Sequence, residues 1–491
     1  MSTMAATFRE SLLERRFRFA EHGTTLARDS MAGLTTFIVM SYIIALNPLI
    51  LTSIKDHHGY ALPFSGVLTS TCMVAAVMSI LMGLYTNRAY AIAPGMGLNA
   101  VVTFGLVGQA GVTWPEAMGI VLLEGVAVTL LVVSGIREAI MKAIPLELKK
   151  AIAIGIGLFI AFIGLYNSGL IVQDPSHATP VQLARLTTWP VFITVFGLVF
   201  TIAMRAIRFR GDLLVGLIGT TIVATLINWG TGYKAFGHSY ATWPHSVVTH
   251  PNFTLFGNIS FHSFSTAELG VIATLTWVFA LFLSDFFDMM GTIVGVGKQA
   301  GYLDKNGELP QIRRPLLIDA LSAMAGGAAS SSSATTYIES GSGVAAGGRT
   351  GWVAIVAGAL FIPFMFLSPI IGMVPPQATA AALVIVGYLM ISNLTEAEEE
   401  AEPGAKSGVT KLAGIDFHDL AIGLAAALTI IVMPFTYTIT DGIGFGFIAY
   451  TLVCASARQW KRIHPFMWVA TAGFVLYFLV PLLQDHVSWF S

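Results

Sequence analysis

The sequence predicts an all-α polytopic membrane protein with about 14 transmembrane segments in a 7+7 inverted repeat. Of its 491 residues, 55% are hydrophobic and only 11% are charged, whereas soluble domains carry roughly 25% charged residues. Apolar stretches of about 18 or more residues recur along the whole chain, which is the length that a membrane-spanning helix needs. Two small, glycine-rich or serine-rich segments interrupt these stretches about half a chain length apart.

The elements follow in chain order. A charged segment, residues 1–27, lacks the apolar core of a cleaved signal peptide and is expected to lie in the cytoplasm. Seven spans are then predicted at 28–52, 63–84, 90–110, 115–134, 147–168, 189–207 and 211–230. After a polar and aromatic loop, 231–266, the second set is predicted at 267–286, 314–330, 332–347, 350–372, 376–393, 416–436 and 441–457.

Basic residues predict the orientation of these spans. With the N-terminus inside, the basic clusters between spans fall on the cytoplasmic side, as the positive-inside rule requires. The charge-rich stretch 394–415 is then a cytoplasmic linker, and the loop 231–266, with one lysine and no arginine, is extracellular. The chain is therefore expected in the cell membrane as a multi-pass protein with a cytoplasmic N-terminus. The apolar run 464–483 either crosses as a fifteenth span or shows that another span is misassigned.

An odd number of spans in each half forces the two halves into opposite orientations, which is typical of inverted-repeat transporters. The third span contains Pro94, Gly95 and Gly97, which weaken a helix, and its counterpart at 330–351 begins with four consecutive serines that are soon followed by Thr335 and Thr336. Non-helical backbone persists at membrane depth only where it is buried in protein or lines a cavity. Two such segments at corresponding positions predict a small-molecule site near the middle of the membrane.

Carboxylates lie in or beside these segments. Glu339 follows Tyr337 in the serine-rich segment, and Asp285 and Asp288 share one face of the eighth span. An acid within a membrane span indicates a functional site by default, because its insertion costs about 2.5–3.5 kcal/mol. The alternative for Asp285 and Asp288 is a solvated position at the cytoplasmic end of their span. For Glu339 the alternative is a purely structural role.

Three further polar residues lie in or near the predicted spans. Asn99 offers both a donor and an acceptor to a ligand, or alternatively bridges two helices. Glu124 is interpreted as a packing or interdomain hydrogen-bonding residue, and Asp319 as a structural residue near a span end. Carboxylates combined with an amide suit a flat heterocycle with N–H groups, and Tyr337 is an aromatic residue that can stack on its ring. No arginine or lysine falls inside the core spans, which argues against an anionic substrate.

Other functional classes find little support. The stretch GVGKQAG lacks the spacing of a phosphate-binding loop, ESGSGV lacks the first glycine of a nucleophile elbow, and the loop histidines show no metal-ligand spacing. The net charge of −1 gives no indication of nucleic-acid binding. We therefore expect no enzyme, no metal and no cofactor. Because no nucleotide-binding domain is recognised, active transport would draw on an ion gradient.

Several motifs carry a family resemblance. The run SATTYIESGSGV resembles a segment of uracil and xanthine permeases of the nucleobase–ascorbate transporter superfamily, and DMMGT resembles their acid-x-x-Gly segment in the eighth span. Together with GLTTFIVMSYIIALNP, APGMGLNA and IESGSGVAAGGRTG, these motifs are similar to the AzgA-like branch of adenine, guanine and hypoxanthine permeases. The resemblance runs from about Arg28 to Arg462.

The resemblance implies a core (transport) domain of residues 28–134 and 267–372 and a gate (scaffold) domain of residues 135–230 and 373–483. It also implies a secondary active transporter whose partners are purine nucleobases, protons, the lipid membrane and a second copy in a homodimer. Import would proceed by proton symport with an elevator-type motion. An anion transporter or channel of the same fold, for sulfate or bicarbonate, is the alternative.

The resemblance further implies that purine binds between the extended parts of the third and tenth spans. Glu339 and an acid of the eighth span would bind it, and Asn99 would help to set specificity. The glycine of acid-x-x-Gly selects Asp288, with Asp285 as the near alternative, and either Glu339 or Asp288 would carry the proton. The remaining predicted contacts are Tyr337, Thr336, Gly97 and Ser340.

Overall fold

The computed structural model describes residues 12–135, 144–175, 179–209, 211–238, 240–244, 246–265, 270–304, 309–399 and 414–486. Within these ranges, eight helices are long and apolar enough to cross a membrane, and five shorter apolar helices accompany them. The first half of the chain contains α2 (Leu26–Met40), α3 (Ile43–Leu51), α4 (Phe64–Thr86), β1 (Ile92–Pro94), α5 (Met96–Ala100), the π-helix η1 (Val101–Gln109), α6 (Trp114–Ser134), α8 (Leu146–Asn167), β2 (Ile171–Val172), β3 (Gln182–Leu183), α9 (Trp189–Ala206) and α10 (Asp212–Gly230).

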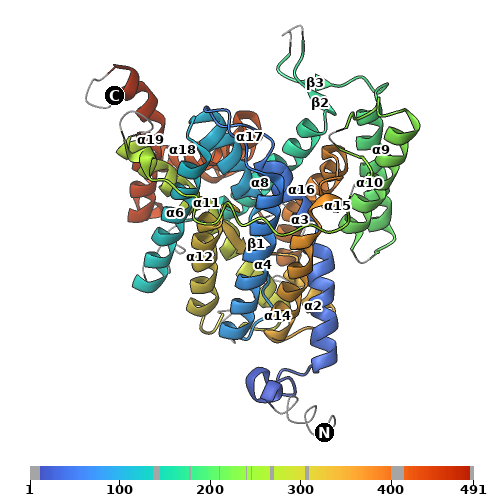
Figure 1. The fold of residues 1–491 in the computed structure, drawn as a ribbon. Helices are drawn as coiled ribbons and strands as arrows, with labels where there is room; N and C mark the ends of the chain where they lie inside the picture. The colour runs from blue at the N-terminus through green and yellow to red at the C-terminus, as the bar shows by residue number, and fades with distance from the viewer. Residues whose placement is uncertain are drawn as a thin grey trace.

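The second half repeats this order of long helices around one short strand (Figure 1). It contains η2 (His262–Phe264), α11 (Val271–Gln299), α12 (Arg313–Ala328), β4 (Ala334–Thr336), α13 (Ser340–Ala345), α14 (Trp352–Phe361), η3 (Ile362–Phe366), α15 (Ser368–Ile371), α16 (Pro376–Glu399), α17 (Leu420–Thr436), α18 (Ile439–Ser456), η4 (Trp460–Arg462) and α19 (Pro465–His486).

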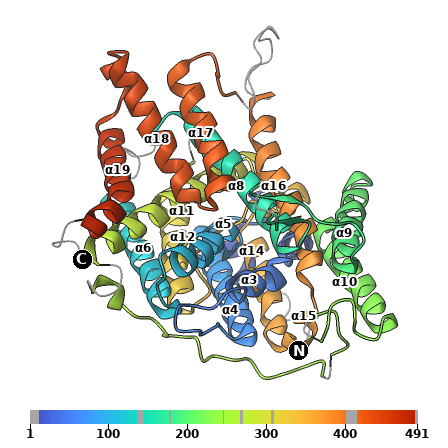
Figure 2. The same cartoon turned by 90° about the horizontal axis from the view of Figure 1, so that it is seen from above.

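The helices pack in two groups (Figure 2). In one group, α2 and α4 pack against α14, and α6 packs against α11 and α12. In the other, α8 packs against α16, with α9 and α10 on α16 and with α17 and α18 on α8. The α8–α16 contact is close, because a Cβ atom at Gly387 would overlap the backbone oxygen of Gly157. The α9–α10 and α17–α18 pairs thus occupy equivalent places on the two central helices, as an internal repeat requires.

The helix α11 is longer at its C-terminal end than the predicted span 267–286. It runs to Gln299, so Asp285 and Asp288 lie in its middle. Asp285 is completely buried and Asp288 is half-buried. The alternative of a solvated pair at the end of a span is therefore wrong, because the apolar helix continues for several turns beyond both acids.

The apolar run 464–483 forms α19, which packs against α18 and against α11. The Trp277 and Tyr477 rings lie 5.7 Å apart at the contact between α11 and α19. The run therefore forms one helix in addition to the seven spans that are predicted for the second half. Of the predicted linker 394–415, the first residues continue α16 to Glu399, and residues 400–413 lie outside the described part of the chain.

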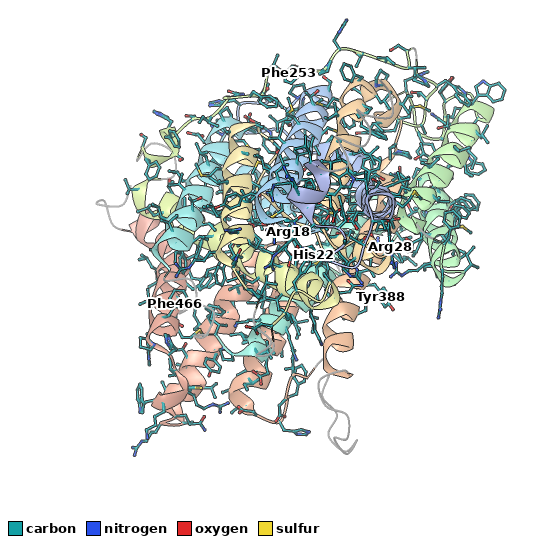
Figure 3. All side chains as sticks on the ribbon, turned by 90° about the horizontal axis from the view of Figure 1, so that it is seen from below. Arg18, His22, Arg28, Phe253, Tyr388 and Phe466 are labelled. Atoms are coloured by element: carbon teal, nitrogen blue, oxygen red, sulfur yellow. The ribbon has the colours of Figure 1, made fainter. Side chains whose placement is uncertain are left out.

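Residues 12–24 pack against the ends of helices of the first group; residues 1–11 lie outside the described part. Phe17 is buried, its ring lies 5.6 Å from that of Trp352, and its carbonyl accepts a hydrogen bond from the side chain of Asn87. In α2, the buried Asp29 accepts hydrogen bonds from Thr24 and from the backbone of Thr350. Figure 3 shows Arg18, His22 and Arg28 together at this end of the molecule.

The described residues of the loop, 231–238, 240–244 and 246–265, extend along the molecule instead of forming long helices, apart from the short η2 (Figure 2). Its backbone amides bond to distant carbonyl oxygens: Ala241 to Met373, Thr249 to Phe366, Gly257 to Ala328 and Ser260 to Pro115. These bonds connect the loop to the ends of several helices of both sequence halves.

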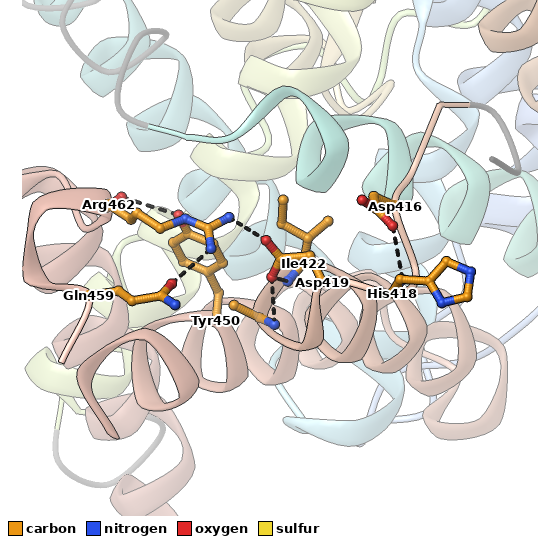
Figure 4. Close-up of polar contacts among 8 residues, drawn as sticks. Asp416, His418, Asp419, Ile422, Tyr450, Gln459 and Arg462 are labelled. Atoms are coloured by element: carbon orange, nitrogen blue, oxygen red, sulfur yellow. Dashed lines mark hydrogen bonds and ion pairs between the residues drawn. The ribbon is translucent and has the colours of Figure 1, made fainter. Parts of the chain in front are cut away.

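A polar cluster at the start of α17 connects three C-terminal helices (Figure 4). Asp419 accepts hydrogen bonds from the amides of Ala421 and Ile422, and the Arg462 guanidinium donates to its other oxygen at 2.7 Å. The bond from Arg462 is the main cause that holds the pKa of Asp419 below its usual value. Asp419 therefore stabilises the fold above its ordinary pKa of about 3.9, and this contribution is lost as the pH falls through its lower folded-state pKa.

We expect Arg462→Gln to reduce this acid dependence. Because the pair is partly exposed, the lost stabilisation is at most about 1 kcal/mol. The measurement is the thermal unfolding midpoint of the detergent-solubilised protein between neutral pH and about pH 3.5, on either side of the ordinary Asp pKa. Lys461→Gln, which removes an exposed charge from the adjacent position, is the control. Identical acid dependence in wild type and Arg462→Gln would contradict the assignment.

Candidate substrate site

The two interrupted segments cross at the centre of the first helix group. Here β1 and β4 pair antiparallel, with Ile92 opposite Thr336 and Pro94 opposite Ala334. The pairing continues through the Gly95 amide, which bonds to the Ser333 carbonyl at 2.9 Å, and the Tyr337 amide, which bonds to the Ala91 carbonyl at 2.9 Å. Both strands are fully buried, which satisfies the requirement that non-helical backbone in a membrane be enclosed by protein. The two segments, which are predicted to occupy corresponding positions in the two halves, are therefore in direct contact.

Glu339 lies immediately after β4, where α13 begins, and is 7% exposed. The Tyr42 hydroxyl donates a hydrogen bond to Glu339 Oε1 at 2.5 Å. Tyr42 is completely buried and lies between the end of α2 and the start of α3. A residue of the first span thus orients the carboxylate of the tenth.

Of the two acids of α11, Asp288 and not Asp285 interacts electrostatically with Glu339. The carboxyl of Asp288 interacts electrostatically with those of Glu339 and Asp319, and both Tyr42 and Tyr337 are close enough to interact with Asp288. Asp285 instead interacts with Glu124, Asp319 and Asp288. Asp288 is also the more accessible of the two acids. Asp288, Glu339 and the two tyrosines therefore form one cluster beside the strand crossing, and Asp285 lies behind it.

Asn99 lies in α5, one turn after β1, and is completely buried. Neither its amide nitrogen nor its amide oxygen has a hydrogen-bond partner among the described residues. Burying an amide group without hydrogen-bond partners destabilises the folded protein by about 1–3 kcal/mol, so such a group calls for an explanation. A bound ligand with both donors and acceptors is one that would satisfy it.

A family model described as a permease family, Xan_ur_permease, matches residues 28–402. The chain belongs to this permease family. The predicted resemblance to purine permeases of the nucleobase–ascorbate transporter superfamily is confirmed at this level, and the chain is a membrane permease and not an enzyme.

Relatives of the permease match it over nearly its full length. It is 36% identical to the adenine permease AdeP of Escherichia coli over 469 residues, which cover 95% of this chain and 96% of that protein. It is 37% identical to the guanine/hypoxanthine permease PbuG of Bacillus subtilis, over 94% of this chain and 98% of that one. It is 31% identical to the nucleobase transporter PlAzg2 of Paenibacillus larvae, over 87% and 77% of the two chains.

Solved structures confirm the predicted fold class of the permease. The transmembrane domain of the cyanobacterial bicarbonate transporter BicA superposes with a TM-score of 0.59 at 14% identity, covering 84% of this chain and 96% of that one. SLC26A9 superposes with a TM-score of 0.56 at 10% identity, covering 88% and 65%. At these identities the likeness shows the fold alone, which is the 7+7 inverted-repeat membrane fold.

Three of the predicted site residues of the permease build the strand crossing. The Thr336 amide and hydroxyl both donate to Asp319, at 2.6 and 2.5 Å. The Ser340 hydroxyl accepts from the Ala91 amide at 2.9 Å, and the Tyr337 hydroxyl donates to the Pro94 carbonyl at 2.5 Å. These contacts occupy the polar groups of Thr336 and Tyr337, so both residues hold the crossing together whatever else they contact.

Gly97 lies where the two helix groups of the permease meet. A Cβ atom there would lie 3.3 Å from a methyl carbon of Ile156 in α8 and 3.3 Å from one of Ile439 in α18. A larger residue at this position would therefore separate α5 from the helices of the second group.

The sequence does not identify Tyr42 as a site residue, and it does not predict that Asp319 supports the strand that precedes Glu339. Tyr42 lies in the apolar stretch of the first span, and only its hydroxyl distinguishes it from a packing residue. Asp319 was placed near a span end, but it is completely buried in α12, where it binds Thr336 and lies close to both acids of α11. The feature of the sequence that could have indicated Asp319 is an acid in an apolar stretch, which is also the feature that indicates Glu339.

Proposed function

We propose that this permease is a secondary active transporter that imports purine nucleobases, namely adenine, guanine or hypoxanthine, together with protons. Relatives named adenine permease and guanine/hypoxanthine permease match it over at least 94% of its length. The observation that carries the proposal is the cluster of Glu339 and Asp288 beside the β1–β4 crossing. A purine presents ring N–H groups that carboxylates accept, and ring nitrogens that accept from an amide.

The proposed binding position is between the start of α5 and the start of α13, with Glu339 and Asp288 accepting from purine N–H groups. Asn99, whose amide has no partner among the described residues, would complete the recognition and set specificity. Tyr337, Thr336, Ser340 and Gly97 shape the site, the first three by holding the crossing and Gly97 by its contact with the second helix group.

The proposed motion is of the elevator type. The core domain, residues 28–134 and 267–372, would carry the site, and the gate domain, residues 135–230 and 373–483, would stay in place. In support, the crossing is hydrogen-bonded within the first helix group, whereas the side chains that face Gly97 from α8 and α18, Ile156 and Ile439, are apolar. We place the protein in the cell membrane as a homodimer with a cytoplasmic N-terminus.

The proposed coupling ion is the proton, with Glu339 or Asp288 as the group beside the substrate that changes protonation. Glu339 is buried and Asp288 is half-buried, and two carboxyls that interact in such a site favour binding of a proton to one of them. Proton binding would then be coupled to substrate binding, because the two occupy the same cluster.

The deciding experiment is uptake of radiolabelled adenine, guanine and hypoxanthine into proteoliposomes. We expect an inward proton gradient to drive accumulation of at least one of these bases, and a protonophore to abolish it. Empty liposomes are the control. Absence of gradient-driven uptake of all three bases would refute the function.

An anion transporter or channel is the second candidate, because the fold is shared with a bicarbonate transporter. The groups that act on Glu339 and Asp288 are carboxyls and tyrosines, which disfavour an anion. Excess unlabelled purine should therefore suppress uptake of the labelled base, whereas excess sulfate or bicarbonate should not.

A further inference from the structure

A second group of carboxyls lies behind the substrate site. Glu124 in α6, Asp285 in α11 and Asp319 in α12 are each 0% exposed, and they interact electrostatically with one another. The groups that act on Glu124 and Asp285 are Ser333, Asp319 and Asp288, together with each other. Burying three carboxyls together is costly unless each is either neutralised or hydrogen-bonded.

Asp319 accepts several hydrogen bonds, and these favour the ionised form of its carboxyl. The backbone amide and the hydroxyl of Thr336 donate to its Oδ1, and the hydroxyl of Thr335 lies 3.4 Å from both of its oxygens. Charge-assisted bonds of this kind stabilise the negative form. The acids with oxygens that lack a hydrogen-bond donor among the other described residues are therefore Glu124 and Asp285.

Glu124 and Asp285 are within hydrogen-bonding range of each other. Ser333 donates to Glu124 Oε2 at 3.2 Å, but Glu124 Oε1 and both oxygens of Asp285 are buried and receive no donor from another described residue. Two ionised carboxylates are acceptors only and cannot bond to each other. The contact is satisfied only if one of the two carboxyls carries a proton.

We propose that Glu124 and Asp285 form a proton-binding site that holds one proton between them, separate from the substrate cluster. When this proton leaves as its O–H bond breaks, the charge of the pair changes from −1 to −2. Asp288 would sense this change, because it interacts with both Asp285 and Glu339. The charge of the pair would thereby control proton uptake by the Glu339–Asp288 cluster, so that coupled transport requires the pair, and this second step rests on the proposed proton symport.

The shared proton can be tested without any substrate. The measurement is the infrared absorption of protonated carboxylic acids in the purified, detergent-solubilised protein near neutral pH. We expect Glu124→Gln and Asp285→Asn each to remove the same component of this band, because each replacement leaves one acid, which the new amide allows to ionise. Glu116→Gln is the matched control: Glu116 is a buried acid of the same helix whose Oε2 already accepts from Thr113.

A band unchanged in both variants would refute the shared proton. Glutamine at position 124 preserves the shape of the side chain and can donate to Asp285, so the fold should survive. If either variant fails to fold, as judged by its thermal unfolding midpoint, the other one decides the result.

The coupling is tested in proteoliposomes with labelled adenine. Gradient-driven accumulation is divided by substrate exchange measured in the same vesicles, since exchange requires no net proton movement. We expect this ratio in Glu124→Gln to fall to the value of protonophore-treated wild type, and that of Glu116→Gln to remain at the wild-type value. A wild-type ratio in Glu124→Gln would refute the coupling. If wild type does not transport adenine, guanine or hypoxanthine, the proposed function fails while the infrared result still decides whether the proton is shared.

Discussion

Glu339→Gln is expected to reduce purine uptake by at least about 10-fold. Glutamine keeps the shape of the side chain but loses the charge, and the NH2 group that replaces one carboxylate oxygen cannot accept a hydrogen bond from a purine N–H. A hydrogen bond to a charged group contributes about 1.5–3 kcal/mol, so the loss of one or two such bonds corresponds to about 10- to 10⁴-fold in affinity. The Tyr42 hydroxyl, which now donates to Glu339, would also lose a charged acceptor.

The measurement is initial uptake of labelled adenine, guanine and hypoxanthine, normalised to the amount of permease in the membrane. Glu147→Gln, which replaces an acid in the first turn of α8, controls for the change of charge. Glu339→Asp should retain part of the activity, because the carboxylate remains but is displaced by one methylene. Wild-type uptake of every base by Glu339→Gln would remove Glu339 from the site.

Tyr42→Phe separates the position of Glu339 from its charge. This variant keeps the carboxylate and removes only the hydroxyl that holds it, so we expect a smaller loss than in Glu339→Gln. If Tyr42 acts only by positioning Glu339, Tyr42→Phe should add little to the loss in the double variant with Glu339→Gln. Losses that multiply in the double variant would mean that Tyr42 contacts the substrate independently.

The existence of the two strands could be predicted from local chemistry. Pro94 cannot donate to a helix ladder, and the serines and threonines before Glu339 compete for backbone hydrogen bonds. Membrane burial then requires that such backbone find partners within the protein. The register, with Ile92 opposite Thr336, could not be predicted. It depends on contacts such as that between Thr336 and Asp319, which join residues from different elements.

The choice between Asp285 and Asp288 shows the same limit. Three residues apart, the two acids share a helix face, so periodicity cannot distinguish them. The structure distinguishes them by their neighbours: Glu124 of α6 lies beside Asp285, and Glu339 lies beside Asp288. Those neighbours come from distant parts of the chain. The family motif selected Asp288 for the site, and the geometry agrees with that choice without testing substrate contact.

The additional helix α19 illustrates what hydropathy leaves open. The apolar run 464–483 had the length of a span, and its length alone could not show where it packs. In the structure it lies against α18 and against α11, the helix that carries Asp285 and Asp288. Contacts such as that of Phe279 with Phe474 therefore connect the C-terminal helix to the helix of the acids.

Asp319→Ala is expected to abolish substrate binding and to lower the thermal unfolding midpoint. The change removes the acceptor for both the amide and the hydroxyl of Thr336 and leaves these groups buried. Each unsatisfied buried group costs about 1–3 kcal/mol, so we expect a total destabilisation of about 2–6 kcal/mol. Because Thr336 is paired with Ile92, the loss also disturbs the β1–β4 register, and with it the position of Glu339 three residues later.

Two measurements distinguish this structural role from a direct contact with substrate. The first is the thermal unfolding midpoint without ligand, and the second is its increase on addition of adenine, guanine or hypoxanthine. Asp319→Asn keeps one oxygen that can accept from the Thr336 amide, so it should recover part of the midpoint and part of the ligand-dependent increase together. Thr335→Ala, which removes only the longer 3.4 Å contacts, should cost less than Asp319→Ala in both measurements. A normal midpoint combined with lost ligand response in Asp319→Ala would instead place Asp319 in contact with the purine, because a residue that only supports the crossing cannot affect binding without affecting stability.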